Sequence, residues 1–81
     1  MKISLLAFGI AKEIFNSGKL DFEIPSETPT VDMLRNQLEA TFPEIKKLSS
    51  YMIAIDNEYA SGNDQIRENN EIAIIPPVSG G

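Results

Sequence analysis

The chain has 81 residues, enough for one small domain with a single hydrophobic core. Hydrophobic residues make up 42% and charged residues 23%, a composition typical of globular proteins that argues against disorder and fibrous repeats. The absence of cysteine and histidine excludes disulfides, thiolate or imidazole metal sites and Cys–His or Ser–His catalytic pairs, and the net charge of −5 argues against a nucleic-acid partner.

The first predicted strand covers residues 2–8, where both alternations are apolar, as in a strand with neighbours on either side. This segment resembles a signal peptide, but Lys12 and Glu13 interrupt the apolar run and no cleavage site follows, so we expect a cytoplasmic protein. No apolar run approaches the roughly 20 residues that cross a membrane.

The next segment, residues 11–15, predicts a helical turn or two. Residues 20–24 alternate apolar with acidic side chains, which predicts a half-buried strand antiparallel to the first.

The main helix is predicted to begin after a loop at residues 25–29. Thr30 is a favourable N-cap for it. An apolar stripe follows at helical spacing and consists of Val31, Leu34, Leu38 and Phe42. Pro43 is expected to end the helix or to begin a short turn that buries Ile45 and Leu48.

Three further strands complete the predicted sheet. Residues 51–55 form a strand, residues 56–58 a turn and residues 59–60 a brief extended piece. Residues 71–75 form the last strand, which is apolar on both faces. We place the first and last strands side by side at the centre, and parallel, because the long crossover between them carries a helix. A mixed sheet packed on one main helix belongs to the α+β class, and this order of elements is the ubiquitin-like β-grasp arrangement.

Side-chain chemistry is hard to find in this sequence. No two carboxylates stand at a spacing that suggests a shared acid–base site. Asp56, Glu58 and Asp64 are interpreted as solvated turn acids, because the twelve-residue calcium pattern is absent. We therefore expect no metal site and no catalytic site built from side chains.

The closing segment is unusual and consists of Pro76, Pro77, Val78, Ser79, Gly80 and Gly81. The prolines stop the final strand and fix an extended backbone, so the segment could reach ~20 Å from the domain. The two glycines could enter a channel too narrow for any Cβ, and the only reactive group is the terminal carboxylate. Taken alone, such an end is often merely frayed. Combined with the predicted fold, it favours a domain at residues 1–75 and a flexible functional tail at residues 76–81.

These features resemble the small subunits of molybdopterin synthase, a family of ubiquitin-like sulfur carriers, over essentially the full length. The closing segment carries the most specific similarity. Shorter similar stretches are residues 7–9, Lys12 with Glu13, Thr30 with Val31 and Leu34, and residues 54–59. One departure is the stretch at residues 68–71, where the family commonly has an Asp/Gly-rich turn. Asn69 and Asn70 tolerate left-handed backbone angles, so we expect the fold to be kept.

The resemblance implies that the active group is the C-terminus itself. An ATP-dependent adenylating enzyme would activate the Gly81 carboxylate, next to Gly80, and a desulfurase or rhodanese-type donor would convert it to a thiocarboxylate. The tail would then enter the large synthase subunit and pass sulfur to the pyranopterin precursor of the molybdenum cofactor, and two such transfers would build the dithiolene that later holds molybdenum. The chain would not be catalytic alone and would bind no cofactor stably. Two copies would assemble with a large-subunit dimer as a heterotetramer.

The same resemblance implies a partner-binding surface formed by Pro76, Pro77, Val78, Ser79, Phe8, Tyr59 and Ile75. Phe8 lies on the opposite alternation from the core positions of its strand, and Tyr59 lies in a short edge piece, so we expect both at the surface. For Ile75, core and interface are equally good interpretations.

Three alternative functions stay open at this point. The nearest is a sulfur carrier of the same fold for thiamine, cysteine or tRNA thiolation. A second is a ubiquitin-like modifier joined to lysines through Gly81, and a third is a passive β-grasp interaction module. The absence of cysteine excludes a persulfide carrier, which leaves the thiocarboxylate as the available form of carried sulfur.

Overall fold

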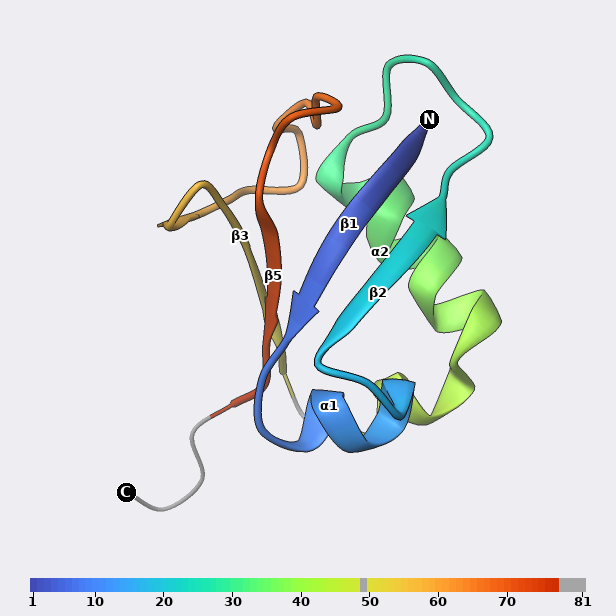
Figure 1. Ribbon diagram of the computed structural model, residues 1–81, viewed down its shortest axis with the longest axis vertical. Coiled ribbons are helices and arrows are strands. Elements are labelled where there is room, and N and C mark those ends of the chain that lie inside the picture. The colour runs from blue at the N-terminus through green and yellow to red at the C-terminus, as the bar shows by residue number, and fades with distance from the viewer. Residues whose placement is uncertain (49, 78–81) are drawn as a thin grey trace.

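The computed structural model describes residues 1–48 and 50–77. Figure 1 shows the order of its elements. Their bounds are β1 Lys2–Ala7, α1 Ile10–Phe15, β2 Lys19–Glu23, α2 Val31–Thr41, the 3-10 helix η1 Pro43–Lys47, β3 Met52–Ile55, β4 Glu58–Tyr59 and β5 Ile72–Ile75. Each element predicted from the sequence is present, with ends shifted by one residue in several cases.

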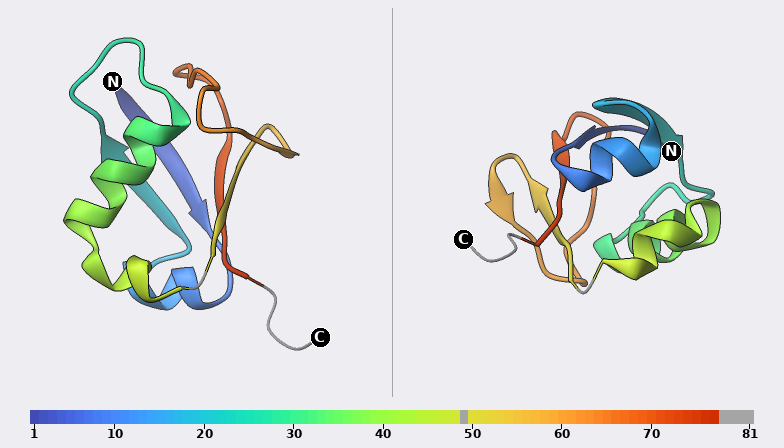
Figure 2. Two further views of the ribbon diagram at one scale, coloured as in Figure 1. Left: turned by 180° about the vertical axis from the view of Figure 1, so that it is seen from behind. Right: turned by 90° about the horizontal axis from the view of Figure 1, so that it is seen from below.

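Within the described residues, the five strands form one sheet in the order β2-β1-β5-β3-β4 (Figures 1 and 2). The central strands β1 and β5 pair in parallel, with Leu6 opposite Ala73, and the other neighbours pair antiparallel. This confirms the predicted placement of the first and last strands. The mixed sheet with its single main helix confirms the β-grasp fold.

The main helix α2 packs across one face of the sheet, and α1 closes the end at which β1 and β5 both finish (Figures 1 and 2). The Thr30 hydroxyl accepts a hydrogen bond from the Met33 backbone N–H at 3.3 Å, which confirms the predicted N-cap. Three members of the predicted stripe are fully buried: Val31, Leu34 and Leu38.

Phe42, the predicted fourth member of that stripe, follows the last residue of α2 and is only partly buried. Its ring packs against Phe15 of α1, with 4.8 Å between the ring centroids. Pro43 begins η1, in which Ile45 is fully buried, and Leu48 behind it is half-buried. This corner therefore joins the end of α2 to α1 and closes one edge of the core.

The turn at residues 67–70 was expected to use left-handed backbone angles at its asparagines, but the structure shows side-chain hydrogen bonds in their place. None of its residues has a positive φ angle. Instead, the Asn70 side chain accepts a hydrogen bond from the Arg67 N–H at 2.6 Å and donates one to the Asp56 carboxylate at 2.8 Å. Positive φ angles occur at Asp56 and Asn57, between β3 and β4, where a two-residue hairpin favours them.

Tyr51 lies directly before β3 and not within it, and its side chain is buried on the side of α2. Its hydroxyl donates a hydrogen bond to the Glu39 carboxylate at 2.9 Å. The Arg35 guanidinium stacks on its ring, 4.6 Å from the centroid. Burial, helped by the bond to Glu39, raises the pKa of Tyr51 to about 12.

This pKa predicts a specific loss of stability in alkali. Unfolded tyrosine ionises near pH 10, so the contribution of Tyr51 should be constant below pH 10 and should be lost as pH rises from 10 to about 12. Tyr51→Phe lacks the ionisable hydroxyl, and its free energy of unfolding should fall less over this interval. Urea denaturation at several pH values checks the difference. Equal falls in both proteins would show that Tyr51 ionises normally when folded.

Candidate functional site

The predicted site residues form two groups, the closing segment and the outer face of the sheet. Four residues of the closing segment lie outside the described residues: Val78, Ser79, Gly80 and Gly81. Pro76 and Pro77 directly follow β5, are half-buried and coincide with the end of that strand, as predicted.

The chain leaves β5 against the bend that follows β1. Gly9, in this bend, has a φ angle of +54°, and a Cβ there would lie 3.1 Å from Cγ of Pro76. The Phe8 N–H donates to the Ile74 carbonyl at 3.3 Å, which carries the β1–β5 pairing up to the bend. Any other residue at position 9 would therefore be strained in its backbone and crowded against Pro76. Residues 7–9 are recognised from the sequence only by their resemblance to a known family. The sequence does not show that this bend lies beside Pro76.

One row of paired residues crosses the outer face of the sheet, the face turned away from the core. Leu6 of β1 lies opposite Ala73 of β5, Ala73 opposite Ala54 of β3, and Ala54 opposite Tyr59 of β4. Since the two central residues are alanines, the row is low in the middle and rises at both ends. The result is a groove between Leu6 and Tyr59.

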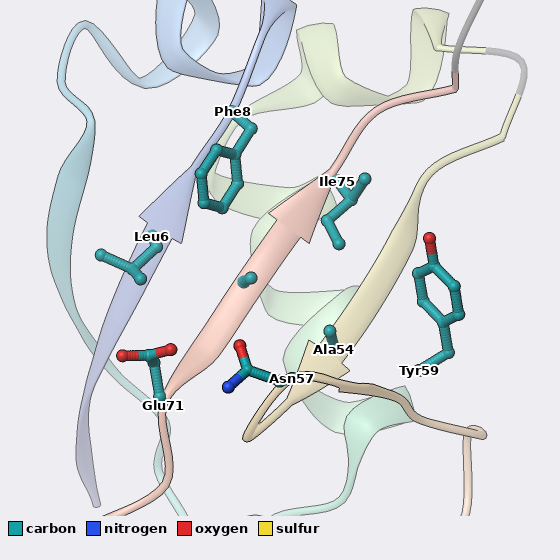
Figure 3. Close-up of a pocket in the computed structure, with 8 residues that line it drawn as sticks. Leu6, Phe8, Ala54, Asn57, Tyr59, Glu71 and Ile75 are labelled. Carbon is teal, nitrogen blue, oxygen red and sulfur yellow. The ribbon is translucent and has the colours of Figure 1, made fainter.

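Figure 3 shows this groove, which has a volume of about 310 Å³. Its lining residues are Leu6, Phe8, Ala54, Asn57, Tyr59, Glu71, Ala73 and Ile75. The structure thus brings together Phe8, Tyr59 and Ile75, the three sheet residues predicted to bind a partner. Phe8 is 50% and Tyr59 68% exposed, whereas Ile75 is half-buried. Their role in binding stays a prediction.

Two further large apolar side chains outside the groove lining are exposed. Met52, opposite Ile75 in the sheet, is 44% exposed, and Ile10, at the start of α1, is 48% exposed. Scattered apolar side chains need no explanation, but apolar residues gathered in one groove, as Leu6, Phe8 and Ile75 are, are typical of an interaction surface.

Sequence reasoning missed the floor of the groove and its polar end. Ala54 and Ala73 give no signal by themselves, because only the pairing register shows that two small residues meet between larger ones. Glu71 and Asn57 come from segments 14 residues apart in the chain, and the sequence pattern of each is that of an ordinary turn. The alternation in β5 could have placed Ala73 outward, but not opposite Ala54.

The arrangement offers a binding surface and few reactive groups. Among residues 1–48 and 50–77, no three Asp or Glu side chains lie close enough together to hold a metal ion. Glu71 supplies the one carboxylate in the lining of the groove, whose other polar groups are the Asn57 amide and the Tyr59 hydroxyl. A groove of this kind suits a protein surface.

No helix in the described part of the chain is both long and apolar enough to cross a membrane.

Known proteins are similar to this chain in sequence, in fold or in both. The molybdopterin synthase sulfur carrier subunit of Dictyostelium discoideum is 34% identical over 99% of this chain and 96% of its own length. The crystal structure of SAMP1 from Haloferax volcanii covers 100% of both chains, with a TM-score of 0.82 and 19% identity.

A third similar structure is the protein–protein complex of subunits 1 and 2 of the molybdopterin-converting factor from Helicobacter pylori. It matches with a TM-score of 0.68 and 21% identity over 100% of both chains. At these identities the two structures show a common fold and nothing more specific. The ThiS family model matches residues 5–81, nearly the whole chain, and this protein therefore belongs to the ThiS family.

Proposed function

We propose that this protein is the sulfur carrier subunit of a molybdopterin synthase and that it carries sulfur on the carboxylate of Gly81. The observation that carries the proposal is the match, along nearly the whole length of both chains, to curated molybdopterin synthase sulfur carrier subunits at 34% identity. Membership of the ThiS family and the β-grasp fold support it.

The proposed chemistry belongs to Gly81 and to partner enzymes. The Gly81 carboxylate attacks the α-phosphorus of ATP on an adenylating enzyme, pyrophosphate leaves, and an acyl-adenylate forms. The terminal sulfur of a persulfide on the sulfur donor, a desulfurase or a rhodanese-type protein, then attacks the acyl carbon, AMP leaves and an acyl disulfide forms. A thiol reductant cleaves this S–S bond, which leaves a thiocarboxylate on Gly81 and a disulfide between the reductant and the donor cysteine. In the large synthase subunit this sulfur passes to the pyranopterin precursor. The chain itself acts as the sulfur-donating subunit and performs no catalysis alone.

The positions of the groove and of the segment that follows β5 fit a protein that docks on one enzyme and presents its C-terminus to it. The groove and the surrounding apolar residues dock on the large subunit, while the segment that begins at Pro76 leaves the sheet beside them. Six residues, 76–81, span at most about 20 Å when extended. A docked domain can therefore place its last carboxylate in an active site on the partner without moving itself.

Sequence similarity separates this proposal from its alternatives better than fold does. A ubiquitin-like modifier and carriers for other sulfur pathways use the same fold, so the likeness to SAMP1 does not favour one of them. The relatives in sequence that support the proposal are molybdopterin synthase sulfur carrier subunits. A modifier would form higher-mass conjugates in cells that disappear on deletion of Gly81.

The direct test is the intact mass of the protein after incubation with its adenylating enzyme, ATP and a sulfide source. We expect a gain equal to the replacement of one oxygen by sulfur, located in the peptide that ends at Gly81. Omission of ATP is the control and should leave the mass unchanged. An unchanged mass with an adenylating enzyme shown to be active would contradict the proposal and favour a modifier or a passive binding module.

A further inference from the structure

Glu71 is the one charged residue that lines the groove, and it lies at the end away from Phe8 and Ile75 (Figure 3). Its backbone is fixed on both sides by Asp56. The Glu71 N–H donates to the Asp56 carboxylate at 2.8 Å, and the Asp56 N–H donates to the Glu71 carbonyl at 2.8 Å. The position of Glu71 at the mouth of the groove is therefore well defined before any partner binds.

The Glu71 side chain is exposed, and its carboxylate accepts no hydrogen bond from any other residue in the described part of the chain. A partner that covered the groove with apolar atoms alone would remove water from this carboxylate without replacing its hydrogen bonds. Such burial is unfavourable, so the partner must bring a donor to this end. A cationic donor makes the strongest hydrogen bonds to a carboxylate.

The rest of the groove suits the stem of a long basic side chain. Ala54 and Ala73 leave a low floor between Leu6 and the Tyr59 ring, on which methylene groups can lie while the charged end reaches polar groups. A guanidinium also stacks on aromatic rings and donates in a planar fork. Asn57, at the same end of the groove, offers an amide oxygen as a second acceptor (Figure 3).

We propose that this groove receives one long basic side chain of the large subunit, an arginine in preference to a lysine, whose stem covers Ala54 and Ala73 and whose head pairs with Glu71. The inference rests on the proposed function, because it names what the partner presents to this surface. Glu71 is then a specificity-determining residue, and the net charge of −5 favours the approach of a basic partner surface.

The test compares two variants that remove the same charge. Glu71→Gln keeps the size of the side chain and the backbone hydrogen bonds, and the dissociation constant for the large subunit should rise at least about tenfold. Glu68→Gln, an exposed acid in the neighbouring turn that does not line the groove, should change it less than about twofold. Isothermal titration at low and high salt measures both, and the affinity of Glu71→Gln should depend less on salt than that of Glu68→Gln.

A second variant tests the stem. Ala73→Leu fills the floor of the groove without a change of charge, and it should also weaken binding about tenfold or more while the melting temperature stays close to that of the parent. Equal affinities of Glu71→Gln and Glu68→Gln would overturn the inference and leave the proposed function standing. Failure of the unmodified protein to bind the large subunit would overturn both.

Discussion

Deletion of Gly81 is expected to abolish dithiolene formation while leaving the fold and the affinity for the large subunit nearly intact. The deletion shortens the proposed carrier arm by about 3.5 Å and moves the terminal carboxylate to Gly80. A reacting group misplaced by even about 1 Å can lose a hundredfold in rate, so sulfur transfer should fall by more than that. Conversion of the pyranopterin precursor in a reconstituted synthase measures the loss.

Two readouts on the same variant separate this role from a structural one. The melting temperature and the dissociation constant for the large subunit should both match those of the complete chain, because the core and the groove are built from residues before Pro76. A large loss of thermal stability would contradict the prediction, since it would make the last residue part of the fold. Retained dithiolene formation would contradict the carrier role itself.

The fold could be predicted from the sequence because its strongest signals are local and agree with one another. Two strands, β1 and β5, have apolar residues on both faces, which predicts that they are central in the sheet. The one amphipathic helix lies between them in the chain, and its apolar stripe predicts that it packs on a face of that sheet. The differences lie where tertiary contacts decide. Phe42 packs against the core as the stripe predicts, but it is the C-cap of α2, is only partly buried, and packs its ring on Phe15.

The candidate site was only partly predictable for a related reason. Phe8 and Tyr59 were expected at the surface because each stands out from the core pattern of its own segment. The groove between them depends on Ala54 and Ala73 being paired across β3 and β5, and on a hairpin turn that brings Asn57 near Glu71. Pairing register joins residues far apart in the chain, and no local pattern in one sequence specifies it.

Phe8→Arg should weaken association with the large subunit at least about a hundredfold. Phe8 is half exposed in the free protein, so an arginine can keep its charge in water there and the domain should remain folded. Once the partner covers the groove, the same charge loses its water and has no fixed acceptor, which is unfavourable. It would also repel the basic side chain that we propose to occupy the groove.

A matched control makes this result specific to the outer face. Met33→Arg introduces the same charge at a side chain that is 36% exposed on α2, the helix that covers the opposite face of the sheet. Its dissociation constant for the large subunit should stay within about threefold of that of the parent. Dissolved ions screen the interaction between an exposed charge and a partner that binds far from it. An unchanged affinity in Phe8→Arg would show that the groove lies outside the interface. The large subunit would then have to hold this protein by its closing segment or by the surface around α1.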